Sequence, residues 1–344
     1  MDSRDRVFRC LEFRRPDRAP RNIWPLPWVG QFAAADFAAV VREFPEDFTG
    51  PGKVLGPCDR WRGEEGRRGT YTDCWGCVWE AAEDGVAGEV KHPPLADWAA
   101  LDQFRAPYEV IDRADWDAAN RAQAANLAGP RRFMLAGTSV RPFERMQFLR
   151  GSENLFLDLA YGTAELRRLR DMVHEFNLKE LQGWVRTDVD GVSFMDDWGS
   201  QKTLLISPAM WRDLFKPLYK DYCDLIRAAG KKVFFHSDGH ILAIYEDLIE
   251  LGMDAVNSQL FCMDIEEIGR RHRGRITFWG EIDRQRVLPF GSVEDVRRAV
   301  GRVRRALETP DGGAIAQCEW GVRTPPENVR AVFAAWLEPV EALP

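Results

Sequence analysis

From residue 131 onward, short apolar runs alternate with amphipathic segments, and this pattern constrains the fold of the 344-residue chain more than any other feature. Strands that alternate with helices of this length are typical of β-α-β units and a parallel sheet. The helical stretches cover 141–186 in pieces, 208–229, 241–251, 265–271, 293–307 and 327–336. The predicted strands are 21–26, 133–138, 191–195, 232–235, 254–259, 276–279 and 313–317.

One more strand from the irregular region 61–101 would bring the count to about eight, the number that closes a (β/α)8 TIM barrel. We therefore predict a single barrel domain over residues 1–344, with an irregular Trp-rich insertion or cover at 57–101. Alternation at 71–80 predicts a β-ribbon inside it. The neighbouring Cys74-Trp75-Gly76-Cys77 could be a redox pair or half a zinc site, but without a second such pair two packed cysteines beside a turn are favoured.

The charge balance excludes some classes of partner. With 47 basic and 54 acidic residues the formal net charge is −7, which argues against nucleic acid and anionic membranes. No apolar run is long enough to cross a bilayer, and residues 1–15 carry charges throughout instead of a signal core, so we expect a cytoplasmic protein. Seven cysteines in a long chain make a disulfide framework unexpected.

Polar side chains follow most of the predicted strands, and the run His236-Ser237-Asp238-Gly239-His240 is the densest of these groups. In a barrel of this class the active site lies at the carboxyl ends of the strands, which we call the mouth. On extended backbone His236 and Asp238 would face the same side and could bind one ion. Alternatively His236 is a core histidine and Asp238 caps the next helix. His240 follows a glycine and ranks lower.

Other strand ends supply further candidates for the mouth. Cys318 could be a third metal ligand, although a lone buried cysteine is more often a small hydrophobe. Glu281 could act as an acid or base or pair with Arg284. Asp196 and Asp197 are adjacent, so only one should reach the mouth, and we expect Asp197, as a catalytic residue that like Glu281 would handle protons or orient the substrate. The candidates for substrate binding are Arg141, as an anion clamp, with Trp198 and Gln259.

The ordered set of motifs resembles the uroporphyrinogen decarboxylase superfamily, which includes corrinoid-dependent methyltransferases. The resemblance implies a (β/α)8 barrel and spans nearly the whole chain. Its motifs lie at residues 15–20 (RPDRAP), 148–155 (FLRGSENL), 190–199 (DGVSFMDDWG), 206–208 with 215–217, 236–239 (HSDG), 280–283 (GEID) with 287–289, and 324–329 (TPPENV).

In the methyltransferase branch of that superfamily, a His-x-Cys pair and a later cysteine bind zinc, and the matching positions here are His236, Asp238 and Cys318. Aspartate in place of a thiolate makes the set of metal ligands harder in the Lewis acid–base sense. This argues against a thiol substrate such as coenzyme M, and an O-, N- or S-methyl substrate fits such a site at least as well. The resemblance thus implies a methyltransferase-like enzyme with zinc and a partner protein that carries a corrinoid.

Two alternatives remain open at this point. The decarboxylase branch works without a metal, but its Arg-rich N-terminal run is replaced here by residues 21–26 (RNIWPL), and its late histidine position holds Cys318. A metal-free decarboxylase of a porphyrinogen or another carboxylate is therefore the second hypothesis. The third is a non-catalytic barrel that binds a ligand through the Trp-rich insertion.

Overall fold

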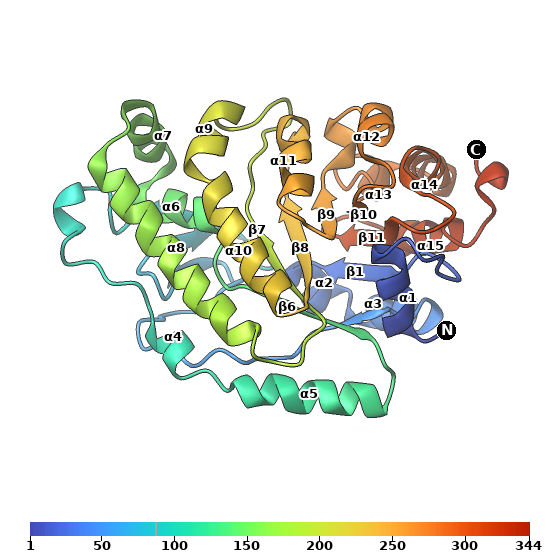
Figure 1. Cartoon of the computed structure of the whole chain (residues 1–344), viewed down its shortest axis with the longest axis horizontal. Helices are drawn as coiled ribbons and strands as arrows, with labels where there is room; N and C mark the ends of the chain where they lie inside the picture. The colour runs from blue at the N-terminus through green and yellow to red at the C-terminus, as the bar shows by residue number, and fades with distance from the viewer. Residues whose placement is uncertain (87) are drawn as a thin grey trace.

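The computed structural model describes residues 1–86 and 88–344, so residue 87 of the predicted insertion lies outside the described part. Eight strands form one nearly closed parallel barrel in the order β1-β11-β10-β9-β8-β7-β6-β2 (Figure 1). This architecture confirms the predicted (β/α)8 barrel. The strands are β1 (Arg21–Pro25), β2 (Phe48–Thr49), β6 (Phe133–Gly137), β7 (Gly191–Met195), β8 (Lys232–Ser237), β9 (Ala255–Ser258), β10 (Thr277–Trp279) and β11 (Ala314–Trp320).

Helices surround the barrel, and long amphipathic ones follow the strands as the periodicity predicts (Figure 1). In the described residues, no helix is both long and apolar enough to pass through a bilayer. The helices are α1 (Ser3–Leu11), α2 (Pro27–Phe32), α3 (Ala34–Glu43), α4 (Glu109–Asp112), α5 (Trp116–Ala128), α6 (Pro142–Arg150), α7 (Ser152–Tyr161), α8 (Ala164–Trp184), α9 (Pro208–Leu214), α10 (Lys216–Ala228), α11 (Tyr245–Glu250), α12 (Ile265–His272), α13 (Val287–Phe290), α14 (Val293–Leu307) and α15 (Pro326–Ala335).

Side chains alternate between the barrel interior and the helix layer, as the pleat of a strand requires. Phe234 of β8 packs inside the barrel with Phe133, Trp279 and residues of α1, while its neighbours Val233 and Phe235 pack outward against the helices. The interior is therefore filled with aromatic side chains at its amino-terminal end. Polar groups on the same inward faces are left for the carboxyl ends, at the mouth.

The eighth strand is β2, outside the region 61–101 where we expected it. It contains only Phe48 and Thr49 and pairs with β6, and two residues are too few to show an alternating pattern in the sequence. The seam between β2 and β1 is joined by a backbone hydrogen bond of 3.0 Å from Asp47 N to Arg21 O. The buried carboxylate of Asp47 also accepts a 2.7 Å bond from the Arg21 amide.

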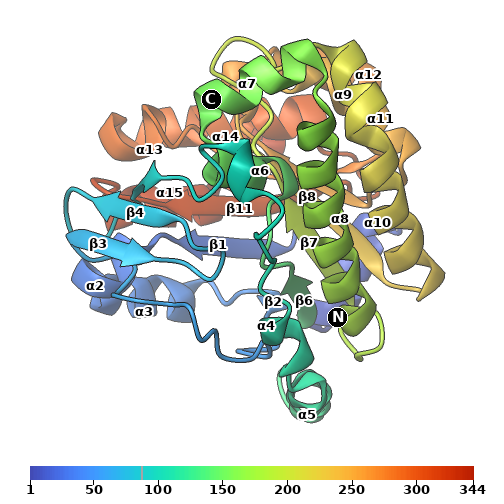
Figure 2. The same cartoon turned by 90° about the vertical axis from the view of Figure 1, so that its left-hand side faces the viewer.

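The region 57–101 contributes no described strand to the barrel and instead forms a separate antiparallel sheet of β3 (Gly69–Thr72), β4 (Val78–Ala81) and β5 (Glu89–His92). The β3–β4 hairpin confirms the predicted ribbon. Figure 2 shows this hairpin on the same side of the molecule as α2 and α3. Gln31 of α2 donates to Gly66 O at 3.2 Å, and Arg145 of α6 pairs with Asp73 at 2.6 Å. The insertion thus reaches elements that follow the carboxyl ends of β1 and β6.

The cysteines of the insertion differ from the expectation of unbonded, packed residues. Cys74 forms a disulfide with Cys58, sixteen residues earlier, and the two α-carbons are 5.8 Å apart. Cys77 is a buried thiol whose Sγ lies 3.4 Å from Phe148 O. The C-x-x-C spacing is therefore not a pair, because the partner of Cys74 comes from a loop with no regular structure.

Candidate functional site

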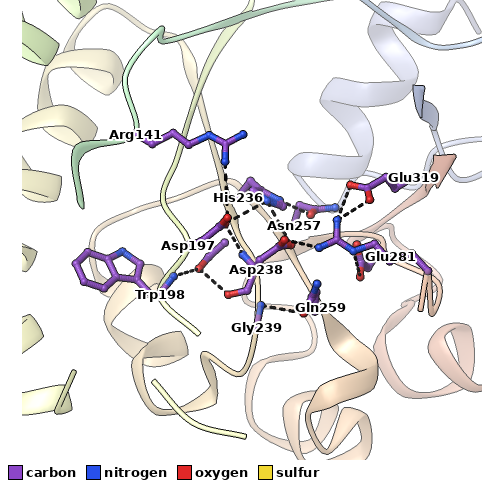
Figure 3. A network of polar contacts seen from close by, with 12 residues as sticks. Arg141, Asp197, Trp198, His236, Asp238, Gly239, Asn257, Gln259, Glu281 and Glu319 are labelled. Atoms are coloured by element: carbon purple, nitrogen blue, oxygen red, sulfur yellow. Dashed lines mark hydrogen bonds and ion pairs between the residues drawn. The ribbon is translucent and has the colours of Figure 1, made fainter. Parts of the chain in front are cut away.

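Three of the residues at the mouth converge on one point. Asp197 follows β7, His236 is near the end of β8, and Asp238 comes directly after it. His236 Nε2 lies 3.5 Å from a carboxylate oxygen of Asp197 and 3.5 Å from one of Asp238 (Figure 3). One donor atom from each residue falls within 4.8 Å of the other two. His236 and Asp238 share this face because they are two residues apart on extended backbone.

The hydrogen bonds around Asn257 fix the orientation and the tautomer of His236. The Asn257 side-chain nitrogen donates to the Trp279 carbonyl, which can only accept, so the amide oxygen faces His236. His236 Nδ1 lies 2.6 Å from that oxygen and must therefore carry the proton. The Nε2 atom, which faces the two carboxylates, is left with its lone pair or takes a second proton.

The spacing at this point is too long for hydrogen bonds and is suited to a bound cation. A distance of 3.5 Å from Nε2 to each carboxylate exceeds a normal N–H···O contact. Ligand atoms about 2.1 Å from a tetrahedral metal are themselves roughly 3.4 Å apart. The Oδ1 atom of Asp238, one of these two oxygens, is buried without any hydrogen-bond partner among the described residues. The residues present therefore fit a divalent cation.

Asp197 is held in place by the backbone of its neighbour. The amide of Asp238 donates to Asp197 Oδ1 at 2.9 Å, the same oxygen that lies near His236. The other carboxylate oxygen of Asp197 lies 3.7 Å from Arg141 Nη1. Arg141 also pairs with Glu144 at 3.0 Å. It thus bridges two acids at the mouth and remains partly exposed.

Arg284 occupies the centre of a second group of carboxylates beside the first. It donates to the Asp238 oxygen that does not face His236, and it binds both oxygens of Glu319 at 2.6 Å (Figure 3). Glu281 lies 3.8 Å away and makes a weaker contact. The planar guanidinium suits this geometry because it presents several donors in fixed directions. Glu281 is thus a weak ion-pair partner of Arg284, which is one of the two roles that the sequence suggested for it.

Glu281 is a strongly perturbed carboxyl group. It is almost completely buried, and this desolvation raises its pKa well above the ordinary value, against the lowering effect of Arg284. Glu281 also lines a cavity of about 260 Å³ together with Gln259 and Arg284. Gln259 accepts from the Gly239 amide at 3.1 Å, so it supports the turn after β8 as well as facing the cavity.

Glu144 is a functional candidate that sequence reasoning missed. It lies in the first turn of α6, which begins at the mouth and is largely buried there. Burial, together with the nearby charge of Asp197, raises the pKa of Glu144 to about 7. A buried carboxyl group between other acids is the signal, and it is visible only in three dimensions.

Asp196 points away from the mouth, as expected for one of two adjacent carboxylates. It caps α6 by accepting from the amides of Phe143 and Glu144, and it accepts from Tyr219 Oη at 2.6 Å. Complete burial raises its pKa to about 8. Its role in the fold is to fix the start of α6 and hence the position of Arg141.

Cys318 does not lie in this group, and the expectation that it faces the mouth was wrong. Its side chain is fully buried in the core between the barrel and the helices, whereas Ile315 belongs to the barrel interior. Alternation along β11 therefore turns Glu319 inward, where it meets Arg284. The polar Gln317 and Glu319 alternate with the apolar Ala316, Cys318 and Trp320, and this period of two indicates Glu319 and not Cys318 as the inward residue, a signal that our prediction did not use.

Trp198 is not at the mouth either. Its indole stacks on Phe143 with the ring centroids 4.2 Å apart, and its Nε1 donates to Tyr219 Oη at 2.7 Å. Figure 3 shows it directed away from His236 and Asp238. Because this side chain is completely buried in the outer core, it cannot touch a substrate, and the expectation of a substrate-binding role was wrong.

Comparisons with known proteins agree with this architecture. The chain is similar over 98% of its length to 98% of a methyltransferase from Methanosarcina mazei, with a TM-score of 0.71 and 15% sequence identity, a likeness that concerns the fold. No curated protein matches the sequence. The model of the family described as uroporphyrinogen decarboxylase (URO-D) matches residues 75–338, more than half of the chain. The chain therefore belongs to the uroporphyrinogen decarboxylase (URO-D) family.

Proposed function

We propose that this protein is a methyltransferase-like enzyme that moves a methyl group between a small O-, N- or S-methyl substrate and a corrinoid on a partner protein. A divalent metal, zinc by preference, would be held by Asp197, His236 and Asp238. The observation that carries the proposal is the buried, unpaired Oδ1 of Asp238, which converges with Asp197 on His236 Nε2. In this proposal Asp197 takes the ligand position that we first gave to Cys318.

The donor set defines the chemistry that such a centre would supply. One nitrogen and two carboxylate oxygens suit zinc and harder first-row cations more than a thiolate site does. A metal bound there would act as a Lewis acid toward the heteroatom that carries the methyl group. Asn257 would keep the His236 lone pair directed at the ion through the bond to Nδ1.

The same residues would handle the proton balance of the reaction. When the carbon–heteroatom bond breaks and the methyl group leaves for the corrinoid, the bonding electron pair stays on the heteroatom, which then needs a proton. Glu281 lines the cavity beside Arg284, and burial raises its pKa well above the ordinary value, which favours the protonated form of this carboxyl group. We assign it the role of proton donor. Gln259, which lines the same cavity, and Arg141, which lies beside Asp197, would orient the substrate.

The charge of the mouth favours this function over the metal-free decarboxylase. A tetrapyrrole with four carboxylates needs unpaired cations, and Arg284 is already engaged by acidic groups. Burial raises the pKa of Glu144 and Glu281 and favours their neutral forms, which leaves three carboxylates facing two arginines, so the mouth offers no free cation to a polycarboxylate. The three are Asp197, Asp238 and Glu319, against Arg141 and Arg284.

The test is spectroscopic and needs no named partner. Purified protein loaded with zinc is mixed with cob(I)alamin and a panel of methyl ethers, methylamines and methyl thioethers, and methylcobalamin formation is followed by its absorbance. We expect turnover with at least one donor class and its loss in His236→Ala. Carbon dioxide release from a porphyrinogen without corrinoid would support the decarboxylase instead. Tight binding of donors without any turnover would support a non-catalytic barrel.

A further inference from the structure

A second cavity lies between the insertion and the end of β6, and four aromatic side chains form part of its walls. It has a volume of about 400 Å³ and is lined by Trp61 and Trp75 of the insertion and by Phe176 and Trp184 of α8. Trp75 and Phe176 meet edge to face with their ring centroids 4.8 Å apart. Flat aromatic walls at such angles favour a planar ring as the occupant, because stacked and edge-on contacts can form together.

Two basic residues give this cavity a positive side. Arg145 pairs with Asp73 through one terminal nitrogen, but its Nε is buried and has no hydrogen-bond partner in the described part of the chain. Lys53, which also lines the cavity, is exposed and forms no ion pair with any described residue. With Asp73 as the one acid on these walls, two cations face one anion. A buried donor without a partner and an unpaired ammonium are what a carboxylate would satisfy.

The cavity adjoins the candidate metal centre through α6 and β6. The Arg145 amide donates to Arg141 O at 2.7 Å, one helical turn away, and Arg141 lies 3.7 Å from Asp197. Gly137, which lines the cavity, pairs with Ser193 of β7, the strand that ends just before Asp197. The cavity and the candidate metal centre therefore lie at the ends of neighbouring strands, β6 and β7, with the first turn of α6 beside both.

We propose that this cavity binds a planar aromatic carboxylate and that the methyl donor belongs to this class. This inference rests on the proposed function for the identity of the transferred group, but not for the binding itself. The carboxylate lies toward Lys53 and Arg145, because these are the basic groups on the walls of the cavity, whereas the mouth carries the carboxylates of Asp197, Asp238 and Glu319. The ring is held between the tryptophans, and the substituent that carries the methyl group points to the mouth.

Binding of benzoate tests the inference without any metal or corrinoid. The full-length protein, treated with a chelator, is titrated by calorimetry with benzoate, with cyclohexanecarboxylate, which lacks the aromatic ring, and with benzyl alcohol, which lacks the charge. We expect benzoate to bind about five-fold more tightly than either analogue. Equal affinity for cyclohexanecarboxylate would overturn the aromatic part, equal affinity for benzyl alcohol would overturn the carboxylate part, and no binding would overturn the whole inference.

Surface variants then place the ligand in this cavity. Lys53→Met should weaken benzoate binding about five-fold, whereas Lys91→Met, which removes a charge elsewhere in the insertion, should leave it unchanged. Trp61→Ala at the rim should weaken it similarly, and the exposed Phe32→Ala should not. If Lys91→Met weakens benzoate binding as much as Lys53→Met, or Phe32→Ala as much as Trp61→Ala, the benzoate site lies elsewhere. Benzoate binding to protein that never binds zinc would refute the proposed function and leave this site standing.

Discussion

The role of Asn257 gives a sharp prediction, because its two hydrogen bonds connect the histidine of the candidate centre to the barrel wall. Asn257→Leu keeps a similar volume but can neither accept the proton of His236 Nδ1 nor donate to the Trp279 carbonyl. His236 would then lose the contact that fixes its tautomer. Loss of such a partner typically weakens metal affinity about 10- to 100-fold, so we expect a zinc Kd raised by that factor.

The same substitution also has a cost for folding that can be measured separately. It leaves a buried N–H and a buried carbonyl without partners, at about 1–3 kcal/mol each, so the free energy of unfolding should fall by about 2–6 kcal/mol. Ser258→Ala is the matched control, since the next residue on β9 bonds outward to Tyr245 Oη at 2.9 Å and does not touch His236. This control should lose stability without losing zinc.

Competition with a chromophoric chelator at pH 7 measures the zinc affinity, and urea unfolding of the metal-free protein measures stability. Zinc affinity of Asn257→Leu equal to that of the wild type, with a loss of stability alone, would refute the reasoning. So would equal weakening of zinc binding in Ser258→Ala, because it would show that any damage to β9 lowers the affinity.

Two further predictions concern the buried charges. Arg284→Met leaves Asp238, Glu281 and Glu319 without their shared cation, so urea unfolding should show a loss of about 3–5 kcal/mol at pH 7. The loss should be smaller at pH 5, where the carboxylates take up protons, and an equal loss at both pH values would contradict this. Because burial raises the pKa of Asp196 to about 8, its ionisation costs stability as pH rises, and the stability of wild type relative to Asp196→Asn should fall by about 2–3 kcal/mol between pH 6 and 9. A constant difference across this range would show that Asp196 is ionised throughout.

Most of the barrel could be predicted from the sequence because apolar residues recur with different periods in its strands and in its helices. Each apolar run from β6 onward is bounded by turn residues and followed by a helical pattern, so the strands were placed to within a few residues. The exception is β2, whose two residues carry no period. Its position depends on pairing with β6 and on the carboxylate of Asp47 at the seam, which are contacts between distant segments.

The candidate site was predictable only where a single strand determines it. His236 and Asp238 come together because two residues of one extended segment share a face. Cys318 was misassigned because we chose it for its ligand chemistry, although the alternation of Gln317 and Glu319 with apolar neighbours marks the inward face of β11. Glu319 was given no role for the same reason. Arg284 and Glu144 lie in a loop and at a helix start, where no period indicates which way a side chain points. Their roles follow from packing across the mouth.

Metal analysis of four matched variants tests the central claim most directly. Purified protein is saturated with zinc, passed through a desalting column and measured for bound metal. We predict about one equivalent in the wild type and in Cys318→Ser, and a loss of bound zinc in His236→Ala, Asp238→Asn and Asp197→Asn, because among the residues that the structure describes only these three bring ligand atoms to this point. Zinc that is lost in Cys318→Ser but retained in Asp197→Asn, or no zinc in the wild type, would contradict the account.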